Sequence, residues 1–101
     1  MDYKIVWLDE ALDDLRKLVE DISRDNPVAA GRLGEAILEQ VQLLAKFPRL
    51  GHVFAKLGRE DVRERPVRPY RIFYQVQDSE RCVYILCLWH GARQEPTILP
   101  R

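Results

Sequence analysis

Hydrophobic residues in the first half of the chain recur three or four positions apart, which is the spacing of amphipathic helices. Two such stripes are present: Ala11, Leu12, Leu15, Leu18, Val19 and Ile22, then Ala30, Leu33, Ile37, Val41 and Leu44. Asp9 is the expected N-cap of the first helix, and Asn26, followed by Pro27, is the expected N-cap of the second. Because only a few residues separate the stripes, we expect an antiparallel helical hairpin that ends at Phe47-Pro48.

The remaining hydrophobic segments have the composition and alternation of β-strands. Residues 3–8 (YKIVWL) form a short β-branched and aromatic run, and residues 70–77 (YRIFYQVQ) form a stronger one. Residues 81–89 (RCVYILCLW) are the most apolar run, which is typical of a central strand. Residues 61–67 predict a weaker strand whose Pro66 places it at an edge or a strand end.

The order of these elements predicts the fold class. We expect one α+β domain over residues 1–101 with the order β-α-α-β-β-β, in which the N-terminal helical hairpin packs on one face of a mainly antiparallel sheet. Residues 48–60 and 90–101 are rich in glycine and proline and are expected to be irregular, the latter as a tail or edge segment. A chain of 101 residues is long enough to bury one core.

Composition indicates the general class of protein and the cellular compartment that we expect for it. Hydrophobic residues make up 47% and charged residues 32%, which is typical of a globular domain, and no apolar run is long enough to span a membrane. The N-terminus has no apolar signal segment, so a cytoplasmic protein is expected. Cys82 and Cys87 lie five apart in one predicted strand, so we expect free, buried thiols on opposite faces. Neither a metal nor a cofactor is expected.

Charge is distributed unevenly although the formal net charge is zero. Residues 1–45 carry five basic and ten acidic side chains, whereas residues 46–101 carry eleven basic and six acidic ones. One interpretation is a basic face for an acidic partner, either a nucleic acid or an acidic peptide. The other, which charge alone favours, is an ordinary charged surface that keeps the protein in solution.

Common catalytic patterns are missing from the sequence. The glycines have neither P-loop nor dinucleotide-binding spacing, and Ser23 and Ser79 have no histidine nearby in sequence to activate them. The first helix carries several carboxylates. Asp9, Asp13 and Asp14 are most simply interpreted as its solvated face.

Five basic residues on the last three predicted strands and at the exit of the final one are the candidate functional set. Alternation places Arg71 and Phe73 on one face of their strand and Tyr70 and Ile72 on the other. If the set gathers at one end of the sheet, it forms a concave surface that could hold a phosphate or a carboxylate, with the histidine as a proton carrier. The alternative is that the arginines form ion pairs and the histidine bonds to the backbone. The set is Arg63, Arg65, Arg71, His90 and Arg93.

Three segments together resemble the ParE/RelE superfamily of bacterial type II toxin-antitoxin toxins. The first is the opening strand that leads straight into the helical hairpin, YKIVWLDEALDDLRKLVEDI at 3–22. The second is RPYRIFYQV at 68–76, preceded by a short basic strand, and the third is LWHGAR at 88–93. They span nearly the whole chain. The resemblance therefore implies a toxin that a cognate antitoxin silences by wrapping it with its C-terminal segment.

Two activities occur in this superfamily. ParE-like members bind DNA gyrase and trap its cleaved-DNA intermediate, whereas RelE-like members are ribosome-dependent endoribonucleases that cut mRNA. The ribonuclease branch is similar to this chain at Arg71, and Arg63, Arg65 and Arg93 could stand for its other basic residues, with His90 as a proton carrier. That branch also carries a tyrosine near its C-terminal end, but the last tyrosine here is Tyr84. The HGAR ending is more similar to the ParE branch.

The resemblance therefore implies a ParE-type toxin without catalytic residues that forms a hetero-oligomer with a ParD-like antitoxin and acts on DNA gyrase. Candidate antitoxin contacts are Arg63, Arg65, Arg71 and Arg93, which acidic groups of the antitoxin would bind. The alternative is a RelE-like ribosome-dependent mRNA endoribonuclease that uses the same arginines together with His90. No membrane is involved in either case.

Overall fold

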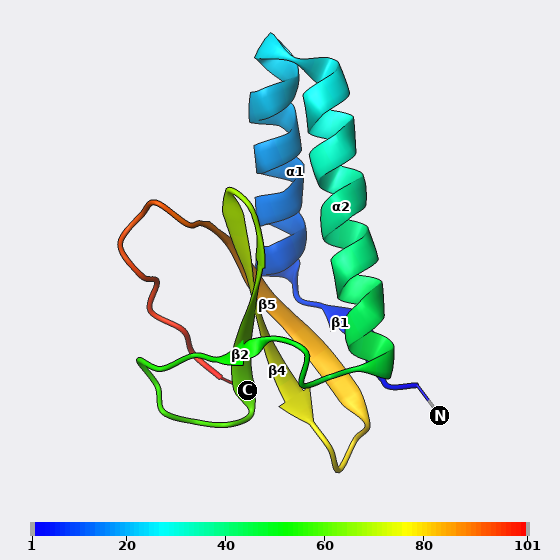
Figure 1. The fold of residues 1–101 in the computed structure, drawn as a ribbon, viewed down its shortest axis with the longest axis vertical. Coiled ribbons are helices and arrows are strands. Elements are labelled where there is room, and N and C mark those ends of the chain that lie inside the picture. The colour runs from blue at the N-terminus through cyan, green and yellow to red at the C-terminus, as the bar shows by residue number, and fades with distance from the viewer. Residues whose placement is uncertain (1, 101) are drawn as a thin grey trace.

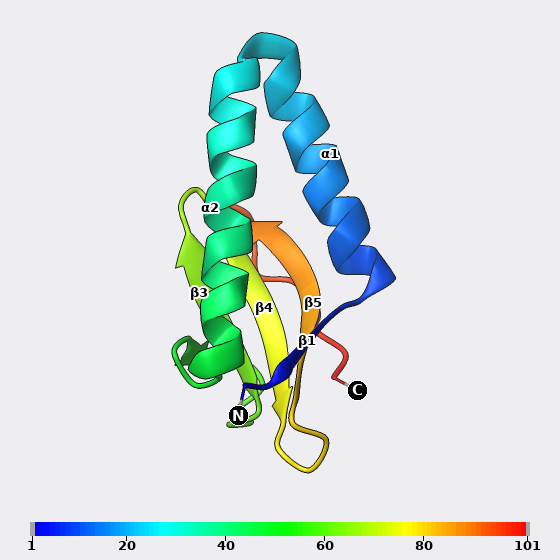
Figure 2. The same cartoon turned by 90° about the vertical axis from the view of Figure 1, so that its right-hand side faces the viewer.

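The computed structural model describes residues 2–100, which form one five-stranded sheet with a helical hairpin packed on it (Figures 1 and 2). In both views the two helices lie side by side and project beyond the sheet. The elements are β1 (Lys4–Trp7), α1 (Asp9–Asp25), α2 (Pro27–Lys46), β2 (His52–Val53), β3 (Val62–Val67), β4 (Tyr70–Gln77) and β5 (Cys82–His90). The predicted α+β class and element order are confirmed.

The sheet has the strand order β1-β5-β4-β3-β2. Only β1 and β5 pair in parallel, with Lys4 opposite Cys82 and Trp7 opposite Ile85, and the other neighbours are antiparallel. β5 is an interior strand, as its apolar composition predicts, although β4 occupies the exact middle position of the order. The two-residue β2 lies in a segment expected to be irregular, because so short a strand shows no alternation in sequence.

The helix starts show one correct and one wrong prediction. Asn26 caps α2, since its side-chain Oδ1 accepts a hydrogen bond from the Ala29 amide at 3.0 Å. α1, in contrast, begins at Asp9 itself, so the expected capping role of Asp9 is wrong: Leu8 occupies the N-cap position and makes no side-chain cap bond. Asp9 and Glu10 lie instead in the first turn, where carboxylates interact favourably with the helix dipole.

The sheet is covered on both faces. On the helix face, α1 and α2 bury Leu18, Ile37 and Leu44 against Ile72 and Ile85 of the sheet. On the opposite face, called here the tail face, a second cluster is formed by Phe54, Val62, Phe73, Cys82, Tyr84, Leu86, Cys87 and Ile98. Ile98 belongs to the C-terminal segment, orange to red in Figure 1, which lies on the other side of the sheet from the helices.

A β-bulge changes which way the end of β5 faces. Phe73 pairs with Cys87 but the next residue, Tyr74, pairs with Ile85, so Leu86 is an extra residue with no partner in β4. Alternation therefore shifts by one position, and Cys87 joins Cys82 in the tail-face cluster. The prediction of opposite faces is wrong for this reason, whereas both thiols are free and buried as expected. Among residues 2–100, no helix is long and apolar enough to cross a membrane.

Candidate functional site

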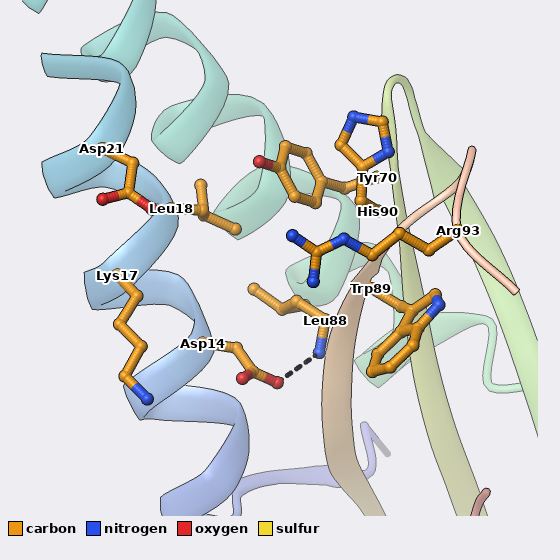
Figure 3. Close-up of a pocket in the computed structure, with 9 residues that line it drawn as sticks. All are labelled: Asp14, Lys17, Leu18, Asp21, Tyr70, Leu88, Trp89, His90 and Arg93. Carbon is orange, nitrogen blue, oxygen red and sulfur yellow. Dashed lines mark hydrogen bonds between the residues drawn. The ribbon is translucent and has the colours of Figure 1, made fainter. Parts of the chain in front are cut away.

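A cleft of about 280 Å³ opens between α1 and the outer half of β5 (Figure 3). It exists because the pairing of β1 with β5 ends at Trp7 and Ile85, so that beyond this point the edge of β5 opposite β4 faces α1. One wall is polar and comes from α1, and the other comes from β5 and the residues that follow it. The lining residues are Asp14, Lys17, Leu18, Asp21, Tyr70, Leu88, Trp89, His90 and Arg93.

Asp14 connects the two walls of this cleft. Its Oδ2 accepts a hydrogen bond at 3.0 Å from the backbone amide of Leu88, the dashed line in Figure 3. Burial raises the pKa of the Asp14 carboxyl above its ordinary value, and the hydrogen bond from Leu88 opposes that shift. The prediction that Asp14 belongs to a solvated face is therefore wrong. The spacing of Ala11, Asp14 and Leu18 along one helical stripe was the signal that indicated its inward position.

His90 and Arg93 meet at the same cleft. The His90 ring packs edge-on against Tyr70 with 5.2 Å between ring centroids, and its Nδ1 accepts a hydrogen bond from the Ala92 amide. Its carbonyl oxygen accepts from the Arg93 amide at 3.0 Å, which forms the turn after β5. From this turn the Arg93 side chain extends across the cleft toward α1 (Figure 3). Within residues 2–100 its guanidinium has no ion pair.

Arg63 and Arg65 both lie on the helix face, opposite Tyr74 and Ile72 of β4, but they bind structural partners. Arg63 donates to the carbonyl oxygens of Glu60 and Gly51, both at 3.0 Å, so it holds the loop beside β3. Arg65 Nε donates to Gln40 Oε1 of α2 at 2.9 Å, which ties β3 to that helix. Neither residue lines the cleft.

Arg71 lies on the tail face, where two carboxylates hold it. Its guanidinium forms ion pairs with Glu64 of β3 at 2.8 Å and with Glu95 of the C-terminal segment at 3.1 Å. The same group stacks over the Phe73 ring at 4.9 Å from the centroid. The predicted sharing of one face by Arg71 and Phe73 is thus confirmed.

The sheet itself separates Arg71 from His90. In the antiparallel register Tyr70 lies opposite His90 and Arg71 lies opposite Trp89, so Arg71 and His90 emerge on different faces. The five basic residues do not gather on one concave surface, since only His90 and Arg93 come together. In the described part of the chain, no three His, Cys, Asp or Glu side chains cluster as metal ligands.

Comparisons with known proteins agree with this fold. Residues 5–95 match the family described as "ParE toxin of type II toxin-antitoxin system, parDE". The chain belongs to the ParE toxin family. A relative of this ParE-family chain, toxin RelE2 of Caulobacter vibrioides, is 33% identical over 90 residues, which cover 89% of the chain and 97% of the relative.

Solved structures extend the likeness. The chromosomal ParDE toxin-antitoxin system of P. aeruginosa has a chain with a TM-score of 0.71 at 20% identity, covering 87% of this chain and 95% of that one. The RelBE2 toxin-antitoxin complex of Mycobacterium tuberculosis contains a chain with a TM-score of 0.66 at 26% identity. The match covers 89% of this chain and 99% of that one. This ParE-family chain is therefore a toxin of a type II toxin-antitoxin system in the ParE/RelE superfamily, and the resemblance seen in the sequence is confirmed.

Proposed function

We propose that this ParE-family chain is a toxin that acts by binding its target, DNA gyrase, and that a ParD-like antitoxin neutralises it. One observation carries the choice of a binding toxin over a nuclease: Arg71 and His90 lie on opposite faces of the sheet. Such a toxin would act in the cytoplasm, where gyrase works.

The chemistry of RNA cleavage explains why this separation matters. In-line attack by a ribose 2′-hydroxyl needs a proton acceptor, a proton donor and charge stabilisation around a single phosphate. Arg71 emerges on the tail face and His90 on the helix face, so the two side chains do not converge on one phosphate position. The carboxylates of Glu64 and Glu95, which hold Arg71, would also repel one. The arrangement therefore supports binding by a surface over catalysis by a residue set.

Which arginines can contact the antitoxin depends on which of their guanidinium groups already have partners within the protein. Arg63 and Arg65 already donate to oxygens of the protein, and Arg71 is ion-paired, so an antitoxin carboxylate would have to displace those partners. Arg93 extends across the open cleft, and its guanidinium has no ion-pair partner within the described residues that an antitoxin carboxylate would have to displace (Figure 3). Of the four arginines expected to bind the antitoxin, Arg93 is thus the one that the geometry favours.

The second candidate is a RelE-like ribonuclease, and one observation favours it. His90 and Arg93 lie together in an open cleft, which supplies a proton carrier and a phosphate-binding guanidinium. The name of the relative toxin RelE2 is consistent with it. Arg63, Arg65 and Arg71 would then have to reorganise on the ribosome.

An mRNA-integrity assay separates the two candidates. Purified toxin is added to translating ribosomes, and the mRNA is followed by primer extension for the wild type and for Arg71→Ala, His90→Ala and Arg93→Ala, with Lys56→Ala as a surface control. We expect intact mRNA in every case, because no complete acid-base set is assembled. Ribosome-dependent cleavage by the wild type that is lost in His90→Ala and Arg93→Ala would overturn the proposal.

A further inference from the structure

We propose that this chain forms a weak symmetric homodimer through the outer side of the C-terminal half of α2, with the α2 helices of the two copies packed antiparallel. This surface, called here the α2 face, consists of Leu38, Glu39, Gln42, Leu43, Lys46 and Phe47. It shares no residue with the cleft that holds Arg93. The inference therefore does not depend on the proposed target or on the antitoxin.

The α2 face exposes large hydrophobic side chains. Leu38, Leu43 and Phe47 leave 47%, 38% and 57% of their surface exposed, whereas Ile37 and Leu44 on the other side of the helix are buried in the core. A depression of about 600 Å³ lies over this side of α2, and a second of about 480 Å³ adjoins it at the end of the helix. In Figure 2 α2 lies in front of the sheet, with its outer side toward the viewer. Such a concentration of exposed apolar surface is typical of an interface.

Two charges of opposite sign lie within this apolar surface. Glu39 and Lys46 are both exposed, and neither forms an ion pair with any residue from 2 to 100. They cannot pair with each other, because seven positions along a helix correspond to about 10.5 Å. Each charge is thus available to a partner that brings the opposite charge to it.

An antiparallel copy of the same helix supplies both opposite charges at once. If the two-fold axis passes between Gln42 and Leu43, residues whose numbers add up to 85 lie at the same level, so Glu39 of each copy meets Lys46 of the other. Leu43 lies beside the axis and contacts its own counterpart, while Leu38 and Phe47 lie at the two ends of the contact. A parallel arrangement would instead place like charges together, which is unfavourable.

This self-complementary pattern favours a second copy over an unrelated partner. An isologous interface requires that each charge find its opposite at the mirror position of the same surface, and Glu39 and Lys46 are equally far from the axis beside Leu43. The formal net charge of zero also means that two copies do not repel each other as whole molecules.

The size of the contact sets the expected affinity. α2 has 20 residues and is about 30 Å long, but the α2 face covers only its C-terminal half. Such a contact is at the small end of specific interfaces, so we expect a dissociation constant of about 10–100 μM.

Sedimentation velocity of the purified chain from about 5 to about 500 μM tests the inference. The wild type should change from monomer to dimer over this range. Glu39→Lys or Lys46→Glu puts like charges at both contacts and should raise the dissociation constant at least about tenfold, as should Leu43→Asp beside the axis. Lys56→Glu, in the loop between β2 and β3, is the matched control and should stay within about twofold. Circular dichroism verifies that each variant is folded.

Mixing the two charge variants separates a paired interface from a general loss of solubility or folding. Glu39→Lys and Lys46→Glu should each be largely monomeric alone, but an equimolar mixture should form a heterodimer within about threefold of the wild-type affinity, because both contacts are again between opposite charges. The double variant Glu39→Lys/Lys46→Glu should also dimerise.

A wild type that stays monomeric up to about 500 μM, or variants that do not associate when mixed, would overturn the inference. Reversals that leave a monomeric wild type unchanged in mass but weaken its binding of the antitoxin would assign the α2 face to the antitoxin, which would also overturn the homodimer.

Discussion

At the scale of single residues, Asp14 shows how a charged side chain can belong to the architecture. Its carboxylate accepts the Leu88 amide at 3.0 Å on the edge of β5 that extends beyond its pairing with β1. A buried amide without a partner costs free energy, so this bond stabilises the junction of α1 and the sheet.

Removing that acceptor should destabilise the protein. Asp14→Ala leaves the Leu88 amide unpaired, and we expect the free energy of unfolding to fall by about 1–3 kcal/mol in urea titrations. Asp14→Asn keeps a carbonyl oxygen and should lose less. Asp13→Ala is the control, because Asp13 is exposed and its ion pair among residues 2–100 is with Arg16, so the loss of stability should stay under about 0.5 kcal/mol. Equal losses at both positions would contradict the role assigned to Asp14.

The pH dependence of the protein's stability, compared with that of Asp14→Asn, follows from the same Asp14 carboxyl. Its pKa is raised in the folded protein, chiefly by burial, so folding favours the protonated form. The favourable contribution is complete below the ordinary value of 3.8 and is lost as the pH rises through the raised pKa. The stability of the wild type relative to Asp14→Asn should therefore decline over that interval, and a constant or rising difference would contradict the account.

Residue-level prediction from sequence succeeds where local chemistry decides and fails where a distant partner decides. Asn26 is predictable as a cap because the cap, the proline and the apolar stripe are contiguous in sequence. The role of Asp14 is not, because its partner, Leu88, is 74 positions away. Alternation predicts that Arg71 shares a face with Phe73, but its ion pairs with Glu64 and Glu95 depend on the fold.

At the scale of elements, the two helix starts differ in how much their side chains contribute to the stability of the helix. Asn26 makes a cap bond to Ala29, whereas Asp9 lies in the first turn of α1, where its carboxylate interacts favourably with the helix dipole. Asn26→Ala should therefore lower the free energy of unfolding by about 0.5–2 kcal/mol, and Asp9→Ala by under about 1 kcal/mol. Thermal and urea unfolding measure both. A larger loss at Asp9 than at Asn26 would contradict the observed start of α1.

The strands show why alternation alone does not predict every face. β4 keeps its alternation, so Ile72 and Tyr74 on the helix face and Phe73 on the tail face follow the sequence pattern. β5 has the extra residue Leu86, which turns Cys87 to the same face as Cys82. A bulge leaves no clear mark in an apolar run of sequence, so this change of face is not predictable. Burial on the tail face raises the pKa of the Cys87 thiol to about 12, so this thiol is a neutral core group.

At the scale of the whole molecule, the sheet separates the basic residues by function. Its helix face carries Arg63 and Arg65 as structural groups and His90 with Arg93 at an open cleft, while its tail face holds Arg71 between two carboxylates. The fold could be predicted from sequence because hydrophobic spacing determines the elements and their order. The site could not, because strand register decides which side chains meet.

The proposed function requires that a surface of this protein poison gyrase without a catalytic set. The most direct measurement is a gyrase cleavage assay with purified toxin, supercoiled DNA and ATP, repeated with equimolar antitoxin. We predict linear DNA covalently linked to gyrase, formed equally by the wild type and by Arg71→Ala, and abolished by the antitoxin. No cleaved complex with the wild type, at concentrations that arrest growth, would contradict the account.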